Sequence, residues 1–134
     1  MTSVVADTQA LIWYILEPEK LSQNALTAFD EVTNAGDLIH LSAISVIEIC
    51  YLIEKGRLSA VVLERIMANV NAPDAVVVII PVDLNVGLAV RQIARATVPD
   101  MPDRIIAATA LYLNLPLVTR DQKIQASAAI LTIW

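Results

Sequence analysis

The stretch Pro102–Ile124, PDRIIAATALYLNLPLVTRDQKI, decides the fold of this chain. Its residues 103–113 are apolar on almost every side of a helix, so we expect a helix that the rest of the protein largely covers. A short apolar run then ends in the polar segment 119–121. If this helix and strand pack antiparallel as one unit, Asp103 and Asp121 lie near each other at one edge of a sheet.

The composition predicts one well-buried domain over residues 1–134. Hydrophobic residues make up 57% and charged residues 17%, which also favours extra apolar surface for a partner. No apolar run approaches the ~20 residues that a membrane-spanning helix needs. The first residues, MTSVVADTQ, lack the features of a secretory signal. The one cysteine, Cys50, stands in an apolar run and cannot form a disulfide within the chain. A free thiol suits a reducing compartment, so we expect a cytoplasmic protein that is not in the membrane.

The charge balance limits how the chain could meet nucleic acid. A net charge of −5 argues against a large basic face, because such binding depends on Lys and Arg at the phosphates. It does not exclude an enzyme whose acids gather in one cleft and are neutralised by metal. Three glycines in total exclude the usual Gly-rich dinucleotide-binding loop.

Strand-like and helix-like segments alternate along the chain. Such alternation predicts an α/β fold with a mostly parallel sheet of about five short strands, wrapped by helices on both faces. The all-apolar segment 75–80 predicts a covered, central strand. Besides the run before 119–121, we expect strands at 3–6, 38–41, 75–80 and 130–133, and helices at 10–16, 23–35, 43–55, 60–70, 84–96, 103–113 and 122–126.

Two acids outside the opening stretch stand where a site could form. Asp7 directly follows the first strand, where α/β sheets bind ligands, although an N-cap of the next helix is the alternative role. Glu48 lies in the middle of the almost wholly apolar helix 43–55. An unpaired carboxylate there would be costly to bury, so it must reach a metal, an open cleft or a cation such as Lys55.

Three other polar residues have less direct links to a site. Asp83 is expected to cap the helix 84–96. His40, the only histidine, is expected to be a structural strand residue, because no second His or Cys stands near it at ligand spacing. Asp100 lies close to Asp103, so either acid could complete a site at the start of the helix 103–113.

We therefore expect four acids to lie at the same edge of the sheet: Asp7, Glu48, Asp103 and Asp121. Four carboxylates in one cleft repel one another unless they are protonated or bound to metal. Oxygen ligands without His or Cys favour Mg²⁺ or Mn²⁺ over zinc. A divalent ion held this way can activate water and stabilise charge on a phosphoryl oxygen, as in metal-dependent nucleases.

Neighbouring residues could support such a site. Thr8 and Thr119 stand where they can orient carboxylates through hydrogen bonds. Arg104 or Arg120 could reach a phosphate, and each could instead form a salt bridge that tempers the acid cluster.

Five segments, in this order and spacing, resemble the PIN-domain family and most closely its VapC-type toxins. They are DTQALIW at 7–13, SAISVIEI at 42–49, KGRL at 55–58, PDRIIAATAL at 102–111 and LVTRDQKI at 117–124. The resemblance implies a three-layer PIN-like fold and a Mg²⁺- or Mn²⁺-dependent endoribonuclease. The family's acidic quartet falls on Asp7, Glu48, Asp103 and Asp121, and its hydroxyl residue on Thr119.

The resemblance also implies a reaction and partners. The reaction is hydrolysis of an RNA phosphodiester by a metal-activated water, and the partner is a small antitoxin that covers the cleft. Trp13, Tyr14 and Tyr51 are candidates for that contact or for a homodimer, or are ordinary core aromatics.

Three other functions compete with this one. A haloacid-dehalogenase-like, aspartate-based phosphotransfer domain needs D-x-D after the first strand, and Gln9 occupies the second position. A receiver-like domain needs a phosphate acceptor at the end of the strand 75–80, where Pro81 and Val82 stand. A catalytically silent PIN-like scaffold is the remaining alternative.

Overall fold

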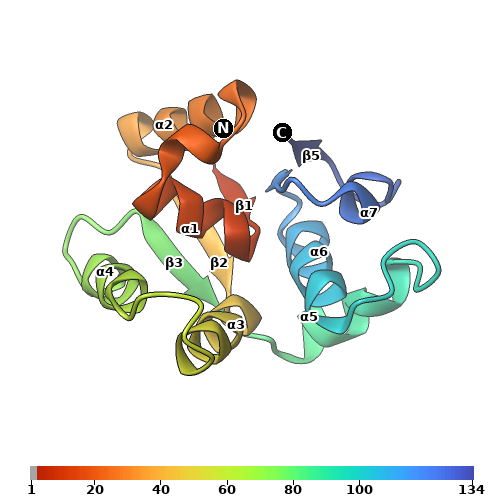
Figure 1. Cartoon of the computed structure of the whole chain (residues 1–134). Helices are drawn as coiled ribbons and strands as arrows, with labels where there is room; N and C mark the ends of the chain where they lie inside the picture. Colours follow the sequence, from red (N-terminus) through yellow and green to blue (C-terminus); the bar gives the residue numbers. More distant parts are fainter. Residues whose placement is uncertain (1–2) are drawn as a thin grey trace.

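The computed structural model describes residues 3–134, whereas Met1 and Thr2, which begin the segment tested for a secretory signal, lie outside the described residues. A parallel five-stranded sheet with the order β3-β2-β1-β4-β5 forms the centre (Figure 1). The strands are β1 (Val4–Ala6), β2 (Ile39–Ser42), β3 (Val77–Ile80), β4 (Leu117–Val118) and β5 (Thr132–Ile133). The helices are α1 (Thr8–Leu16), α2 (Gln23–Ala35), α3 (Ala43–Glu54), α4 (Val61–Val70), α5 (Leu84–Ala89), α6 (Met101–Leu113) and α7 (Gln122–Gln125), with short 3₁₀ turns η1 (Pro18–Lys20) and η2 (Val90–Gln92).

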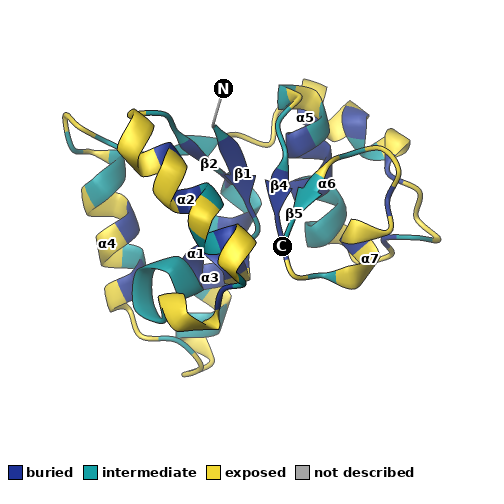
Figure 2. Ribbon diagram, turned by 90° about the horizontal axis from the view of Figure 1, so that it is seen from above, coloured by how far each residue is buried: buried dark blue, intermediate teal, exposed yellow. Residues whose placement is uncertain are grey.

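Helices cover both faces of the sheet, which confirms the predicted α/β architecture. Strand β1 shows why, because successive side chains point to opposite faces. Val4 and Ala6 pack in the cluster with α1, α2, α3 and α4, whereas Val5 packs with α5, α6 and α7. Figure 2 shows buried residues concentrated on the sheet and on the inner sides of these helices.

The helix of the opening stretch is covered as predicted. Residues 106–110 of α6 are all buried. The helix begins at Met101, two positions earlier than expected, because the side chain of Asp100 caps it and Pro102 fits its first turn. Asn114 ends it in the left-handed conformation, with φ of 54°.

Two expectations about the middle of the chain are wrong. The strand 75–80 was expected to be central, but β3 forms an edge of the sheet and only Val77 in it is buried. An apolar run indicates that helices such as α4 cover the faces of a strand. It does not indicate that another strand pairs with it on each side. The predicted helix 84–96 ends at Ala89, because the chain tightens into the 3₁₀ turn η2, in which Ile93 N–H donates to Val90 O. Arg104 also donates to the carbonyls of Val90 and Ile93.

Smaller features follow the sequence more closely. The side chain of Asp83 caps α5 by accepting from Val86 N–H. His40 Nδ1 lies 3.1 Å from the carbonyl oxygen of Val4, which can only accept, so this nitrogen donates and ties β2 to β1. Cys50 is partly buried. Within residues 3–134, no helix combines the length and apolar character needed to cross a membrane.

Candidate functional site

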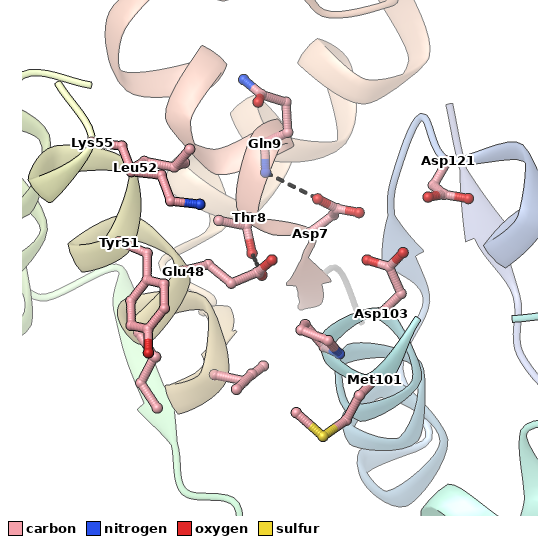
Figure 3. A pocket seen from close by; sticks show the side chains of 13 residues that line it. Asp7, Thr8, Gln9, Glu48, Tyr51, Leu52, Lys55, Met101, Asp103 and Asp121 are labelled. Atoms are coloured by element: carbon pink, nitrogen blue, oxygen red, sulfur yellow. Dashed lines mark hydrogen bonds between the residues drawn. The ribbon is translucent and has the colours of Figure 1, made fainter. Parts of the chain in front are cut away.

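A cleft of about 590 Å³ opens beyond the carboxyl ends of the strands, where the predicted acids meet. Asp7, Glu48, Asp103 and Asp121 all line it, each from a different part of the chain (Figure 3). They follow β1, lie within α3, begin α6 and follow β4, respectively. The parallel sheet brings them together because its strands all end at the same edge.

Asp7 both caps a helix and lines the cleft, so its capping role does not exclude a role in a site. Its Oδ1 accepts from the backbone N–H of Gln9 at 2.9 Å, which caps α1. Its Oδ2 accepts from the hydroxyl of Thr119 at 2.8 Å. Burial raises the pKa of Asp7, as does the charge of Asp121, while the two hydrogen bonds partly oppose this rise.

Thr119 links two acids of the cleft. It is fully buried, and its Oγ1 also accepts from the backbone N–H of Asp121 at 3.0 Å. Asp121 in turn uses Oδ1 to cap α7, accepting from Lys123 N–H at 2.8 Å and from Ile124 N–H at 3.1 Å. The position predicted to orient a carboxylate therefore contacts both Asp7 and the segment that bears Asp121.

Glu48 is held by the hydroxyl of Thr8, which a second hydroxyl contacts in turn. Its Oε1 lies 2.7 Å from Thr8 Oγ1, which lies 2.7 Å from Ser45 Oγ. A hydroxyl has one proton, so Thr8 donates to the carboxylate when Ser45 donates to Thr8. Lys55 lines the same cleft, yet no salt bridge joins it to Glu48 in the part of the chain that the structure describes.

The pKa of Glu48 is raised, chiefly by burial. The Thr8 hydrogen bond lowers it, and the charges of Asp7 and Asp100 raise it. Ser45 was missed by the sequence analysis. The signal that could have revealed it is its position three residues before Glu48, on the same face of α3.

Asp100 and Asp103 have different surroundings, which separates the two candidates. Asp100 is exposed and caps α6, with Oδ2 accepting from Asp103 N–H at 3.1 Å. Asp103 lines the cleft. Desolvation by burial, together with repulsion by Asp100, Asp121, Asp7 and Glu48, raises the pKa of Asp103 to about 7.

The two arginines of the opening stretch have partners other than the acids. Arg104 donates to the carbonyls of Val90 at 2.9 Å and Ile93 at 2.8 Å, so its guanidinium is used to fix η2. The expectation that it reaches a phosphate or forms an acidic salt bridge does not match this geometry. Arg120 lies over the ring of Trp13, with Cζ 5.4 Å from the ring centroid.

The three aromatic residues considered for a partner contact have different surroundings. Tyr14 stacks on Phe29 at 4.8 Å between centroids, and its hydroxyl donates to Asp30 at 3.0 Å. It is therefore an ordinary packed aromatic. Tyr51 is 59% exposed and lines the cleft, and Trp13 belongs to the cluster around Arg120.

The chemistry of the donors suits a hard divalent cation. The pKa values of Asp7, Glu48 and Asp103 are raised first by burial and then by repulsion from neighbouring carboxylates. Among residues 3–134, no three Asp, Glu, His or Cys side chains converge into a complete metal site. Mg²⁺ does not require one, because it keeps several waters and often binds one or two carboxylates. The residues therefore fit Mg²⁺ or Mn²⁺ with water completing the coordination.

Comparison with known proteins gives relatives over nearly the whole length. A protein of Mycobacterium tuberculosis named Ribonuclease VapC22 is 27% identical over 131 residues, which cover 94% of this chain and 92% of that protein. The crystal structure of VapBC2 from Rickettsia felis, bound to a DNA fragment from their promoter, matches with a TM-score of 0.72 at 14% identity, covering 97% and 96% of the two chains.

Two further structures are similar in fold. DNA-bound VapBC from Salmonella typhimurium matches with a TM-score of 0.67 at 22% identity, over 98% of this chain and 97% of that one. FitAcB from Neisseria gonorrhoeae matches with a TM-score of 0.61 at 22% identity, over 96% and 95%. The family model for the PIN domain matches residues 4–130. By fold and by sequence, this chain belongs to the PIN domain family.

Proposed function

We propose that this chain is a metal-dependent endoribonuclease that hydrolyses RNA phosphodiester bonds, as the toxin of a toxin–antitoxin pair. The observation that carries the proposal is the gathering of Asp7, Glu48, Asp103 and Asp121 in one cleft, with no ion pair to any of them from residues 3–134. Membership of the PIN domain family and similarity to Ribonuclease VapC22 support it.

In this proposal Mg²⁺ or Mn²⁺ would be held by carboxylates of this set, with waters completing its coordination. Such an ion would lower the pKa of a bound water and neutralise negative charge on the phosphate. Thr119 fixes the orientation of Asp7, and Thr8 fixes that of Glu48, so these acids do not need to reorganise when substrate arrives. Asp103 must release the proton that its raised pKa lets it keep near neutrality.

The net reaction adds water across one phosphodiester bond. The water oxygen bonds to phosphorus, one P–O ester bond breaks, and the leaving oxygen takes up a proton. The acids that line the cleft can bind the cation and hold the attacking water by hydrogen bonds.

We further propose that a small antitoxin covers the cleft. Exposed apolar side chains surround its acids, including Ile47 at 51%, Tyr51 at 59% and Met101 at 66%. Apolar surface of this kind marks contact sites. We also propose that the chain forms a homodimer, for which the exposed residues Leu84 and Leu88 give similar support. The unpaired Cys50 supports action in the cytoplasm.

The direct test is incubation of the purified protein with a panel of RNAs and Mn²⁺ or Mg²⁺, with and without EDTA. We expect internal cleavage of at least one RNA that EDTA abolishes. The matched control is Asp103→Asn, prepared identically, which excludes a contaminating ribonuclease. A wild-type protein that binds the antitoxin but cleaves no RNA would favour the silent-scaffold alternative.

A further inference from the structure

A cluster of aromatic and cationic side chains lies beside the acid cleft, and the proposed chemistry does not use it. The rings of Trp13 and Trp134 lie 6.1 Å apart between centroids, at an angle of 48°. Arg120 Cζ lies 5.4 Å and Lys20 Nζ lies 5.9 Å from the centroid of the Trp13 ring. We call Trp13, Lys20, Arg120 and Trp134 the cation–aromatic cluster.

The fold makes this cluster continuous with the cleft. Gln9 lines the cleft, and Trp13 follows it by four residues, so both lie on the same face of α1. Arg120 directly precedes Asp121, another residue of the cleft. Trp134 follows β5, the parallel neighbour of β4, and therefore emerges at the same edge of the sheet.

The two cations of the cluster differ in how far they are neutralised. Lys20 forms a 2.6 Å ion pair with Glu17. Arg120 is exposed, and within residues 3–134 no acid lies within salt-bridge distance of it and no acceptor takes its N–H groups. Its guanidinium is thus positioned by an aromatic ring while its hydrogen-bond donors stay available.

We propose that the cation–aromatic cluster is a binding subsite for single-stranded RNA next to the scissile bond. The proposal rests on the proposed ribonuclease activity, because an RNA strand that crosses the cleft must leave it along one side. Arg120 can bind a phosphate through its free N–H groups or stack its plane on a base, and the tryptophans add apolar ring surface. This local positive charge resolves the conflict between an acidic chain and a polyanionic substrate.

The chain offers a selective probe of this subsite. Trp13 and Trp134 are its two tryptophans, and both belong to the cluster. Intrinsic tryptophan fluorescence of the full chain therefore arises from this cluster alone. The background is Asp103→Asn, which is expected to bind RNA without cutting it. The ligand is a short oligouridylate, and inorganic polyphosphate supplies negative charge without bases.

We expect oligouridylate to change the tryptophan fluorescence saturably and polyphosphate to do so far less. Adding Arg120→Ala should weaken RNA binding about fivefold or more, consistent with the loss of one stacking or phosphate contact. Arg120→Lys should restore only part of the affinity, because it keeps the charge but not the plane. Lys20→Ala should have a smaller effect, because Glu17 already neutralises that charge.

The matched control is Arg91→Ala, which removes an exposed arginine that donates to Leu88 O and lies outside the cleft. It should bind like the parent. In otherwise wild-type protein, Arg120→Ala should raise KM about fivefold or more with kcat within about twofold. A purely structural role would instead lower stability and kcat together.

Several results would overturn this subsite. They are RNA binding without a fluorescence change, equal affinity of Arg120→Ala and its parent, or an equal response to polyphosphate. Loss of antitoxin binding in Arg120→Ala with unchanged RNA affinity would assign the surface to a protein instead. Absence of RNA cleavage by the wild-type protein would refute the proposed function, whereas the binding experiment still decides the subsite.

Discussion

The hydroxyl of Thr119 donates a 2.8 Å hydrogen bond to Oδ2 of Asp7, a residue 112 positions away in the chain. The same oxygen accepts from the backbone N–H of Asp121. One buried hydroxyl therefore sets the relative position of two cleft acids that come from the ends of two neighbouring strands, β1 and β4.

Replacing Thr119 with Val should loosen both acids. The change leaves Asp7 Oδ2 and Asp121 N–H without their partner, so we expect a loss of about 1–3 kcal/mol in the free energy of unfolding. Cleavage should fall about tenfold or more, because the orientation of Asp7 is lost. Denaturant titration and initial rates measure the two effects. Thr119→Ser, which keeps the hydroxyl, is the control, and equal rates for the Val and Ser variants would contradict the proposed role.

Removing the charge of Asp7 or Asp103 should abolish metal-dependent cleavage. We expect Asp7→Asn and Asp103→Asn each to lose about a hundredfold or more in rate, because both are proposed to hold the cation. The circular dichroism spectrum should stay that of the wild type. Asp74→Asn changes an exposed acid in the connection between α4 and β3 and should cleave normally. Full activity in either site variant would refute the assignment.

The stability of the metal-free protein should depend on pH through Asp103. Its pKa is 3.8 in the reference state and about 7 in the fold. Between these values the folded chain keeps a proton that the unfolded chain has lost. The free energy of unfolding therefore falls as the pH rises across this window, and burial of Asp7 and Glu48 acts in the same direction.

Asp103→Asn should remove most of this dependence. We expect the variant to be more stable than the wild type by about 1–2 kcal/mol above about pH 7, with allowance for the partial exposure of the carboxylate, and equally stable near about pH 4. Denaturant titrations with EDTA present measure the difference at both pH values. A variant less stable than the wild type at neutral pH would show that the acid cluster is not strained.

Divalent cations should stabilise the wild-type protein more as the pH rises. The carboxyls must lose protons to bind metal, so affinity for Mn²⁺ should increase through about pH 7. We expect weak binding without RNA, detectable by calorimetry at millimolar concentrations, and a weaker signal for Glu48→Gln. A wild-type protein that takes up no Mn²⁺ under these conditions would count against Glu48 and Asp121 as ligands.

The hydroxyl of Thr8 should influence the pH at which Glu48 loses its proton and can act in the proposed reaction. Its hydrogen bond lowers the pKa of Glu48, which burial raises. Thr8→Val should therefore shift the acidic limb of the pH–rate profile to higher pH, and Thr8→Ser should leave it near that of the wild type. An unshifted profile for the Val variant would mean that ionisation of Glu48 does not limit cleavage.

Some local features of the fold were predictable because they depend on neighbouring residues. The span of α2, Gln23–Ala35, was predicted to the residue, since Ser22 caps its start and Gly36, with φ of 70°, ends it. The place of β3 at the sheet edge was not predictable. Strand order depends on how distant segments pair, and an apolar run looks alike at the edge and in the centre.

By itself the sequence determined which acids follow strands or interrupt apolar helices, because alternation of strands and helices fixes one common edge. Only the tertiary structure decided their partners. In the fold, Thr119 donates a hydrogen bond to Asp7, and the hydroxyl of Ser45 contacts that of Thr8. Arg104 donates to the carbonyls of Val90 and Ile93 and not to an acid of the cleft. A hydrogen bond needs its two atoms within about 3 Å. Residues far apart in sequence meet that condition only once packing has fixed their positions.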